Sequence, residues 1–118
     1  RAVAELLPRP VVQTAQAILV IVTDSRPAYG DMSFKPQDYG AAVENMLLAV
    51  TALGYATVWL DGVLRHDGIA GKIADIIGLK DRKHFTVSVI LPVGVPVEAG
   101  AQNTRLPLEE RVTFNTMD

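Results

Sequence analysis

Apolar positions along the chain form three short runs that have the composition and spacing of β-strands. Residues 17–23 (AILVIVT) are continuously apolar and rich in β-branched side chains, which predicts a strand covered on both faces. Residues 84–91 (HFTVSVIL) alternate instead, which predicts a strand with its odd-numbered residues on one face and its even-numbered residues on the other. We expect the PVGVP segment at 92–96 to break this strand sharply. A third, short strand is predicted at residues 56–60.

The longest helical pattern covers residues 41–53, and Pro36 fits the first turn of the helix that leads into it. The residues of this segment are apolar nearly all round, and Gly54 follows as a stop signal. A helix without a wide polar face is buried. Two settings for that burial stay open: the centre of the chain's own domain and an oligomer interface.

A second helix is predicted after a turn at residues 61–67, with Asp67 as its N-cap. Isoleucines at positions 69, 73, 76 and 77 fall on one face of this helix, and Gly78 closes it. The residues from 98 onward read as a flexible loop followed by an extended segment. We expect this tail to reach away from the rest of the chain.

The composition describes one domain without a disulfide framework or a strongly charged surface. The 118 residues are 49% hydrophobic and 20% charged, a slight hydrophobic surplus that favours apolar surface given to a partner or a ligand. The net charge of −2 leaves no basic patch for nucleic acid. The absence of cysteine excludes thiol chemistry and fits a cytoplasmic protein. No apolar run is long enough to span a membrane, and two isolated histidines, His66 and His84, cannot build a metal site.

Side chains with the spacing of a hydrolytic or phosphate-binding site are absent from the sequence. None of Ser25, Ser33 and Ser88 has a nucleophile-elbow context, and neither histidine has a partner identifiable from its spacing. No glycine-rich phosphate loop of a common type occurs. A cofactor that brings its own reactivity would need no such side chains, because the protein then supplies binding, orientation and electrostatics.

Five segments follow one another in order between residues 17 and 114: AILVIVTD, ENMLLAVTALGYATVWLDG, IADIIGL, SVILPVGVP and TRLPLEERVTF. This ordered set resembles the carboxyl-terminal two-thirds of the nitroreductase family of FMN-dependent NAD(P)H oxidoreductases. The resemblance implies an α+β fold in which helices pack a small mixed sheet and an extended carboxyl-terminal tail leaves the domain. It also implies a homodimer, in which the tail embraces the partner subunit and the flavin lies at the interface.

The same resemblance implies which residues bind FMN. The glycine turn after the strand that contains Trp59 would place the backbone N–H groups of Asp61 and Gly62 at the N5/O4 edge of the flavin. Arg105, just before a Leu-Pro pair, would bind the FMN phosphate, for which the planar fork of arginine is suited. Asn103 stands where many relatives have a second basic residue, and would add a hydrogen bond without charge. No side chain is expected to be catalytic, because the flavin carries the chemistry.

One departure from the family pattern leaves two functions open. Family members begin with a helix that carries an Arg-Ser-x-Arg type motif for the FMN phosphate, and neither Arg1 nor Arg9 falls in that pattern. We therefore expect residues 1–118 to form a single, partial nitroreductase-like domain whose beginning is missing or processed away. The leading hypothesis is an FMN-dependent NAD(P)H oxidoreductase that reduces a small electron-poor acceptor by a ping-pong scheme. The alternative is a non-catalytic dimerising fragment, or a degenerate relative, that binds flavin weakly or not at all.

Overall fold

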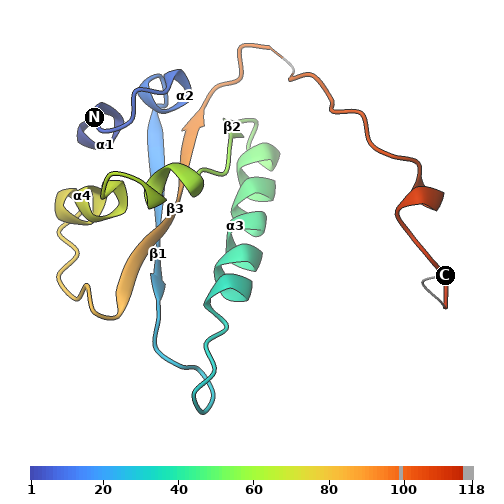
Figure 1. The fold of residues 1–118 in the computed structure, drawn as a ribbon. Coiled ribbons are helices and arrows are strands. Elements are labelled where there is room, and N and C mark those ends of the chain that lie inside the picture. The colour runs from blue at the N-terminus through green and yellow to red at the C-terminus, as the bar shows by residue number, and fades with distance from the viewer. Residues whose placement is uncertain (99, 116–118) are drawn as a thin grey trace.

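The computed structural model describes residues 1–98 and 100–115 (Figure 1). A three-stranded sheet lies at the centre, with the strand order β1-β3-β2. Helix α3 covers one face of the sheet, and α1, α2, α4 and the 3-10 helix η1 pack on the other. The elements in chain order are α1 (Ala2–Glu5), α2 (Pro10–Gln13), β1 (Ala17–Asp24), α3 (Lys35–Ala52), β2 (Ala56–Thr57), η1 (Gly62–Arg65), α4 (Ile69–Ile76), β3 (Phe85–Gly94) and the 3-10 helix η2 (Leu108–Glu110).

This architecture confirms the α+β class and corrects the expected pairing within the sheet. Both β1 and β2 run antiparallel to β3, where the resemblance had implied a mixed sheet. Strand β1 agrees with the predicted 17–23 run in its bounds, but it is an edge strand on which Leu19 and Val22 are 40% and 36% exposed, so the predicted cover on both faces was wrong. Strand β2 is shorter than the predicted 56–60, because regular pairing stops at Thr57 and resumes only as an isolated bridge between Leu60 and Ile90.

The central strand β3 continues through Pro92, where the sequence predicted a sharp break. Pro92 is fully buried, pairs opposite Ile18 of β1, and is followed by two more strand residues up to Gly94. Proline has no N–H to give to a ladder. Successive residues of a central strand bond alternately to its two neighbours, and Ile90 and Gly94 both pair on the β2 side, so Pro92 faces that side too. Pairing with β2 is interrupted at that point, at residues 58 and 59, so the missing N–H costs no ladder bond.

A β-bulge at Ser88 divides the side chains of β3 between the two faces of the sheet. The register with β1 shifts between Ile21, which is opposite Val89, and Val22, which is opposite Val87, so Ser88 is the extra residue. Val87 consequently belongs to the core under α4, whereas Val89 belongs to the core under α3. The prediction that all odd-numbered residues share one face was wrong, because one inserted residue reverses the alternation.

Helix α3 packs one face on the sheet and leaves the opposite face exposed. Val43 and Val50 are buried, whereas Leu48 and Leu53 are 60% and 74% exposed. Burial all round within the chain's own domain is therefore wrong for this helix, because a sheet on one side covers only one side of a helical cylinder. Burial at an oligomer interface stays a prediction.

Helix α4 begins at a glycine and not at the predicted aspartate cap. Gly68 is the N-cap residue with a φ of 67°, and Asp67 has a φ of 51°, so both take the left-handed conformation that turns the chain from η1 into α4. Ile69 and Ile73 are buried as predicted. The isoleucines at 76 and 77 are 43% and 42% exposed, which shows that the last turn of α4 extends past the packed core.

The chain after β3 leaves the body of the molecule, as predicted, and carries apolar side chains into solvent (Figure 1). The radius of gyration is 17.4 Å, against about 13–14 Å for a compact domain of this length. Val97 and Phe114 are 98% and 82% exposed, and η2 is closed by hydrogen bonds within the tail itself. The tail therefore has apolar surface to offer to another molecule.

Candidate functional site

Asp61 stands where the last pairing with β3 ends and a 3-10 helix begins. Leu60 exchanges both backbone hydrogen bonds with Ile90, at N···O distances of 3.1 and 3.0 Å. Asp61 follows as the N-cap of η1, and its carbonyl oxygen accepts the N–H of Leu64 at 2.9 Å. The turn that was predicted after the Trp59 strand is therefore a short helix start that the central strand anchors.

The carboxylate of Asp61 is paired with a cation of the same short helix. Arg65 Nη2 lies 2.9 Å from Asp61 Oδ2. Arg65 was not among the predicted site residues, although an acid followed four residues later by arginine is the signal for such a pair. Only one of the five guanidinium N–H groups is used in this bond, so the others remain able to donate to a further acceptor.

Gly62 opens the backbone to an approaching molecule, although its own conformation does not require glycine. Its φ is not in the left-handed region, and a Cβ placed on it would meet no atom within 4 Å. Its N–H lies in the first turn of η1, where a helix has no internal acceptor, and it bonds to no backbone carbonyl among the described residues. A backbone N–H without a backbone acceptor, on a residue whose Cβ side is open, is thus present at the predicted position.

A hollow of about 460 Å³ opens beside Asp61, between η1, the first turns of α3 and strand β3. Lys35 and Tyr39 line it from α3, Arg65 lines it from η1, and Ser88 lines it from the bulge. We call it the Lys35–Arg65 hollow. Lys35 was not predicted to belong to the site, and the signal available in the sequence was a cation at the first residue of a long helix, where the helix dipole disfavours positive charge.

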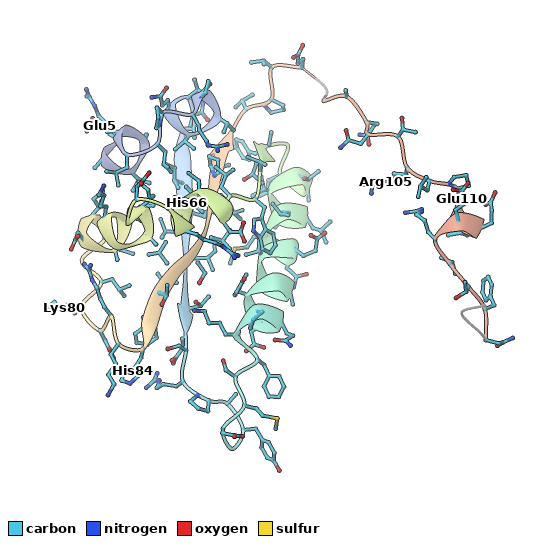
Figure 2. The ribbon with its side chains drawn as sticks, in the orientation of Figure 1. Glu5, His66, Lys80, His84, Arg105 and Glu110 are labelled. Carbon is cyan, nitrogen blue, oxygen red and sulfur yellow. The ribbon has the colours of Figure 1, made fainter. Side chains whose placement is uncertain are left out.

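The two predicted phosphate-binding residues, Asn103 and Arg105, lie on the tail and not beside Asp61 and Gly62. Both are exposed, and Figure 2 shows Arg105 far along the tail, well separated from η1, whose end is marked by His66. Asp61 and Gly62 therefore lie together at the start of η1, whereas Arg105 lies far from both of them within one chain.

A second group of charged side chains ties the end of β1 to the start of β3. Arg26 Nε lies 2.9 Å from Asp24 Oδ2, and its guanidinium stacks 5.4 Å from the centroid of the Phe85 ring. The hydrogen bonds from Arg26 lower the pKa of Asp24 to about 2, and the same pairing raises the pKa of Arg26. His84 Nδ1 lies 2.8 Å from Asp81 Oδ2, and this hydrogen bond lowers the pKa of Asp81. The Arg26–Phe85 contact joins the end of β1 to the start of β3, and the His84–Asp81 bond lies within the turn that precedes β3, so both have a structural role.

The described residues contain neither a metal-binding cluster nor a helix able to span a membrane. His66 is exposed at the end of η1, apart from His84 (Figure 2). No group of three acidic or histidine side chains in residues 1–98 and 100–115 is placed to hold a metal ion. Within the same ranges, every helix is too short or too polar to cross a membrane.

An antiparallel three-stranded sheet with helices on both faces, an open glycine at a strand end and a detached tail together define an α+β domain with room for a ligand beside η1. Comparison with known families then gives the identity of this domain. Residues 2–95 match the nitroreductase family, and the chain belongs to that family. No curated protein gives a significant match to the chain.

Two solved structures have the same fold. A candidate NADH dehydrogenase/NAD(P)H nitroreductase from Bacteroides thetaiotaomicron VPI-5482 matches with a TM-score of 0.73 and 19% identity, over 97% of this chain and 64% of its own. A nitroreductase family protein from Clostridium difficile 630 matches with a TM-score of 0.66 and 20% identity, over 90% of this chain and 63% of its own. The chain thus spans slightly less than two thirds of the length of either protein. Identities this low establish a shared fold and no more.

Proposed function

We propose that this chain is part of an FMN-dependent oxidoreductase that takes hydride from NAD(P)H and reduces a small electron-poor acceptor by a ping-pong scheme. The observation that carries the proposal is the position of Gly62, in a chain that belongs to the nitroreductase family. Its N–H has no backbone acceptor and its surroundings are open. A bound FMN would supply the redox chemistry, so the protein needs no catalytic side chain.

The residues at the start of η1 suit the edge of a flavin ring. In this proposal the N–H groups of Asp61 and Gly62 donate to the N5/O4 edge, where preorganised donors stabilise negative charge on a reduced ring. Arg65 neutralises the Asp61 carboxylate at 2.9 Å, which removes a charge that would oppose that anionic state. The exposed face of Gly62 leaves room for a substrate to stack on the ring.

The phosphate end of FMN is assigned to the tail. Arg105 would donate two parallel hydrogen bonds to the phosphate, and Asn103 would add a neutral one. Because the tail is detached within one chain, these residues reach a ring at Gly62 only if the tail folds back or crosses to a second subunit. The phosphate contact is therefore coupled to assembly.

A homodimer is the assembly that we propose. Leu48 projects from the uncovered face of α3, alanines 41 and 52 are exposed on the same face, and Leu53 is exposed at the carboxyl-terminal end of the helix. Small residues allow a second helix to approach closely, and the large ones bury apolar area. Leu106, Leu108 and Phe114 of the tail are 59%, 62% and 82% exposed and supply further apolar surface. Joining these surfaces between two copies would cover both and hold the tail near a flavin.

The experiment that tests the function is a visible absorption spectrum of the purified protein, taken before and after FMN is added and excess FMN is removed on a desalting column. A retained flavin band that NADH then bleaches under anaerobic conditions is the expected result. A protein that stays colourless after incubation with FMN would overturn the proposal.

A non-catalytic dimerising module is the second candidate, and the position of the tail favours it. Asn103 and Arg105 meet none of the other predicted flavin contacts within one chain, and Asn103 adds no charge to the phosphate contact. A colourless dimer in the same experiment would support this candidate.

The cellular setting in this proposal is the cytoplasm, where NAD(P)H is available. The absence of cysteine is compatible with a reducing compartment. The acceptor is a small molecule of the quinone, enone or nitroaromatic type, because such electron-poor compounds accept hydride equivalents from a reduced flavin.

A further inference from the structure

The Lys35–Arg65 hollow has more positive than negative charge on its walls. Lys35, Arg65 and Asp61 are the charged residues that line it, which leaves one net positive charge. Its volume of about 460 Å³ falls within the range of about 300–1,000 Å³ that is usual for small-molecule sites. The hollow is therefore large enough for a ligand and electrostatically suited to an anion.

Among the three charged residues that line the hollow, Lys35 has no ion pair within the part of the chain that the structure describes. Its side chain is half-buried, and none of the ion pairs found in residues 1–98 and 100–115 includes it. It also occupies the first residue of α3, where the helix dipole makes a cation unfavourable. Placing an unpaired cation there costs folding free energy, and an anionic ligand would offset that cost.

Neutral donors complete the lining of the hollow. Three hydroxyl-bearing residues, Tyr39 from α3 and Thr86 and Ser88 from β3, also line it, and the Ser88 hydroxyl lies 2.6 Å from Thr23 Oγ1. The bulge at Ser88 turns the strand at this point, and bulges commonly re-aim side chains next to binding sites. Two cations with several hydroxyl groups form the donor set that an oxyanion requires.

A second hollow beside Lys35 is a poorer site for an anion. Lys35 also borders a neighbouring hollow of about 340 Å³ against β1, but that hollow contains the carboxylates of Asp24 and Asp38. Asp24 is paired with Arg26, but no ion pair found in residues 1–98 and 100–115 includes Asp38, whose carboxylate repels an anion there. The single carboxylate on the Arg65 side is paired at 2.9 Å. An anion is therefore favoured on the Arg65 side.

We propose that the Lys35–Arg65 hollow binds the oxyanion of a substrate, held by Lys35 and Arg65 with hydroxyl donors from α3 and β3. The identity of the oxyanion rests on the proposed function: it is a phosphate of the dinucleotide hydride donor or a carboxylate of the acceptor. Asp61 belongs to both sites, because the proposed function assigns its N–H to the flavin ring while its carboxylate is bonded to Arg65 at 2.9 Å. A substrate anchored in the hollow would thus be aligned next to Gly62.

The test is a titration of the isotopically labelled 118-residue chain with inorganic phosphate and, separately, with benzoate, followed by the amide NMR spectrum. Shifts concentrated at Lys35, Arg65 and residues 86–88, with millimolar affinity, are expected. Lys35→Gln should weaken the affinity about tenfold, since it removes a charge-assisted hydrogen bond. Lys80→Gln removes an exposed lysine outside the hollow and should leave the affinity unchanged. Shifts spread over all basic residues, or an affinity that Lys35→Gln does not change, would overturn the site.

A second variant and a comparison of the two anions separate the possible results of this titration. If Lys35→Gln loses the native spectrum, Arg65→Gln takes its place, with the same expected weakening. Tighter binding of phosphate than of benzoate assigns the hollow to the hydride donor, and the reverse order assigns it to the acceptor. A chain that shows these shifts but retains no FMN would keep the oxyanion site and overturn the proposed function. A chain that retains FMN without shifts that depend on Lys35 would overturn the oxyanion site alone.

Discussion

Thr23 Oγ1 and Ser88 Oγ lie 2.6 Å apart across β1 and β3, at the bulge where the register of the sheet changes. Thr23 is buried, so the bond satisfies a hydroxyl that has little access to water. The same bulge sends Val87 and Val89 to opposite faces. One hydroxyl pair therefore holds the residue that separates the two cores.

Removal of this hydroxyl pair should destabilise the protein by a measurable amount. We expect Ser88→Ala to lower the free energy of unfolding by about 1 kcal/mol, since a part-buried hydrogen bond is lost. Urea denaturation of Ser88→Ala, Thr23→Val and the double variant gives the coupling between the two hydroxyl groups. Strictly additive effects of the two single variants would contradict a direct bond.

The Asp24–Arg26 pair predicts an unusual titration at the acid end of the pH range. NMR titration should give a pKa of about 2 for Asp24, and Arg26→Gln should return it toward the ordinary 3.8. Because the folded-state pKa is depressed, the pair stabilises the fold above about pH 4, and this contribution is lost as the pH falls from about 4 to 2. Arg9→Gln, which changes an exposed arginine elsewhere, should leave the pKa of Asp24 where it is.

Gly62→Val separates a folding role for this glycine from a binding role. The new side chain meets no neighbouring atom and the backbone is not left-handed, so stability should change by no more than about 0.5 kcal/mol. A flavin packed on Gly62 would be displaced, and we expect FMN affinity to fall at least about tenfold. Fluorescence titration of FMN measures this, with Gly71→Val in α4 as the control. Unchanged FMN affinity in Gly62→Val would remove Gly62 from the site.

The proposed phosphate contact predicts how a change of charge at residues 103 and 105 alters the affinity for FMN. Arg105→Gln is expected to weaken FMN binding about tenfold, since it removes a charge-assisted contact. Asn103→Lys should strengthen binding, because it restores the second cation that the family resemblance implies. Gln102→Lys adds the same charge one residue earlier and serves as the control. If Gln102→Lys strengthens binding as much as Asn103→Lys does, the effect is general electrostatic attraction and not a phosphate contact.

The uncovered face of α3 predicts the oligomeric state. We expect a homodimer by light scattering after gel filtration, and a monomer for Leu48→Asp, because a charge at the centre of an apolar interface is costly to desolvate. Leu48 is 60% exposed in the single chain, so the fold should survive and far-UV circular dichroism should not change. Ile76→Asp changes an exposed isoleucine on α4 and should stay dimeric. A wild-type protein that elutes as a monomer would contradict this assembly.

Local sequence patterns predicted most of the elements. The β-branched run before Asp24 forms β1, the alternating run before Pro92 forms the core of β3, and Pro36 lies in the first turn of α3. The short strand before Asp61 was predicted too long, because its pairing depends on a partner that carries a proline. The position of Gly62 at a strand end followed from the sequence, whereas Lys35 and Arg65 became part of one hollow only through packing of α3 against η1 and β3.

The difference between the features that the sequence predicted and those that it did not has a physical cause. Strand and helix formation depends on neighbouring residues, so β-branched runs, prolines and glycines in the chain establish where elements begin and end. The bulge at Ser88, the tolerated Pro92 and the half-covered α3 depend on which residue lies across a strand or under a helix, far away in the chain. The register of the strands, the face that each side chain occupies and the lining of the hollow therefore depend on neighbours that only folding brings together, and Arg105 lies on a tail that is detached from them within one chain.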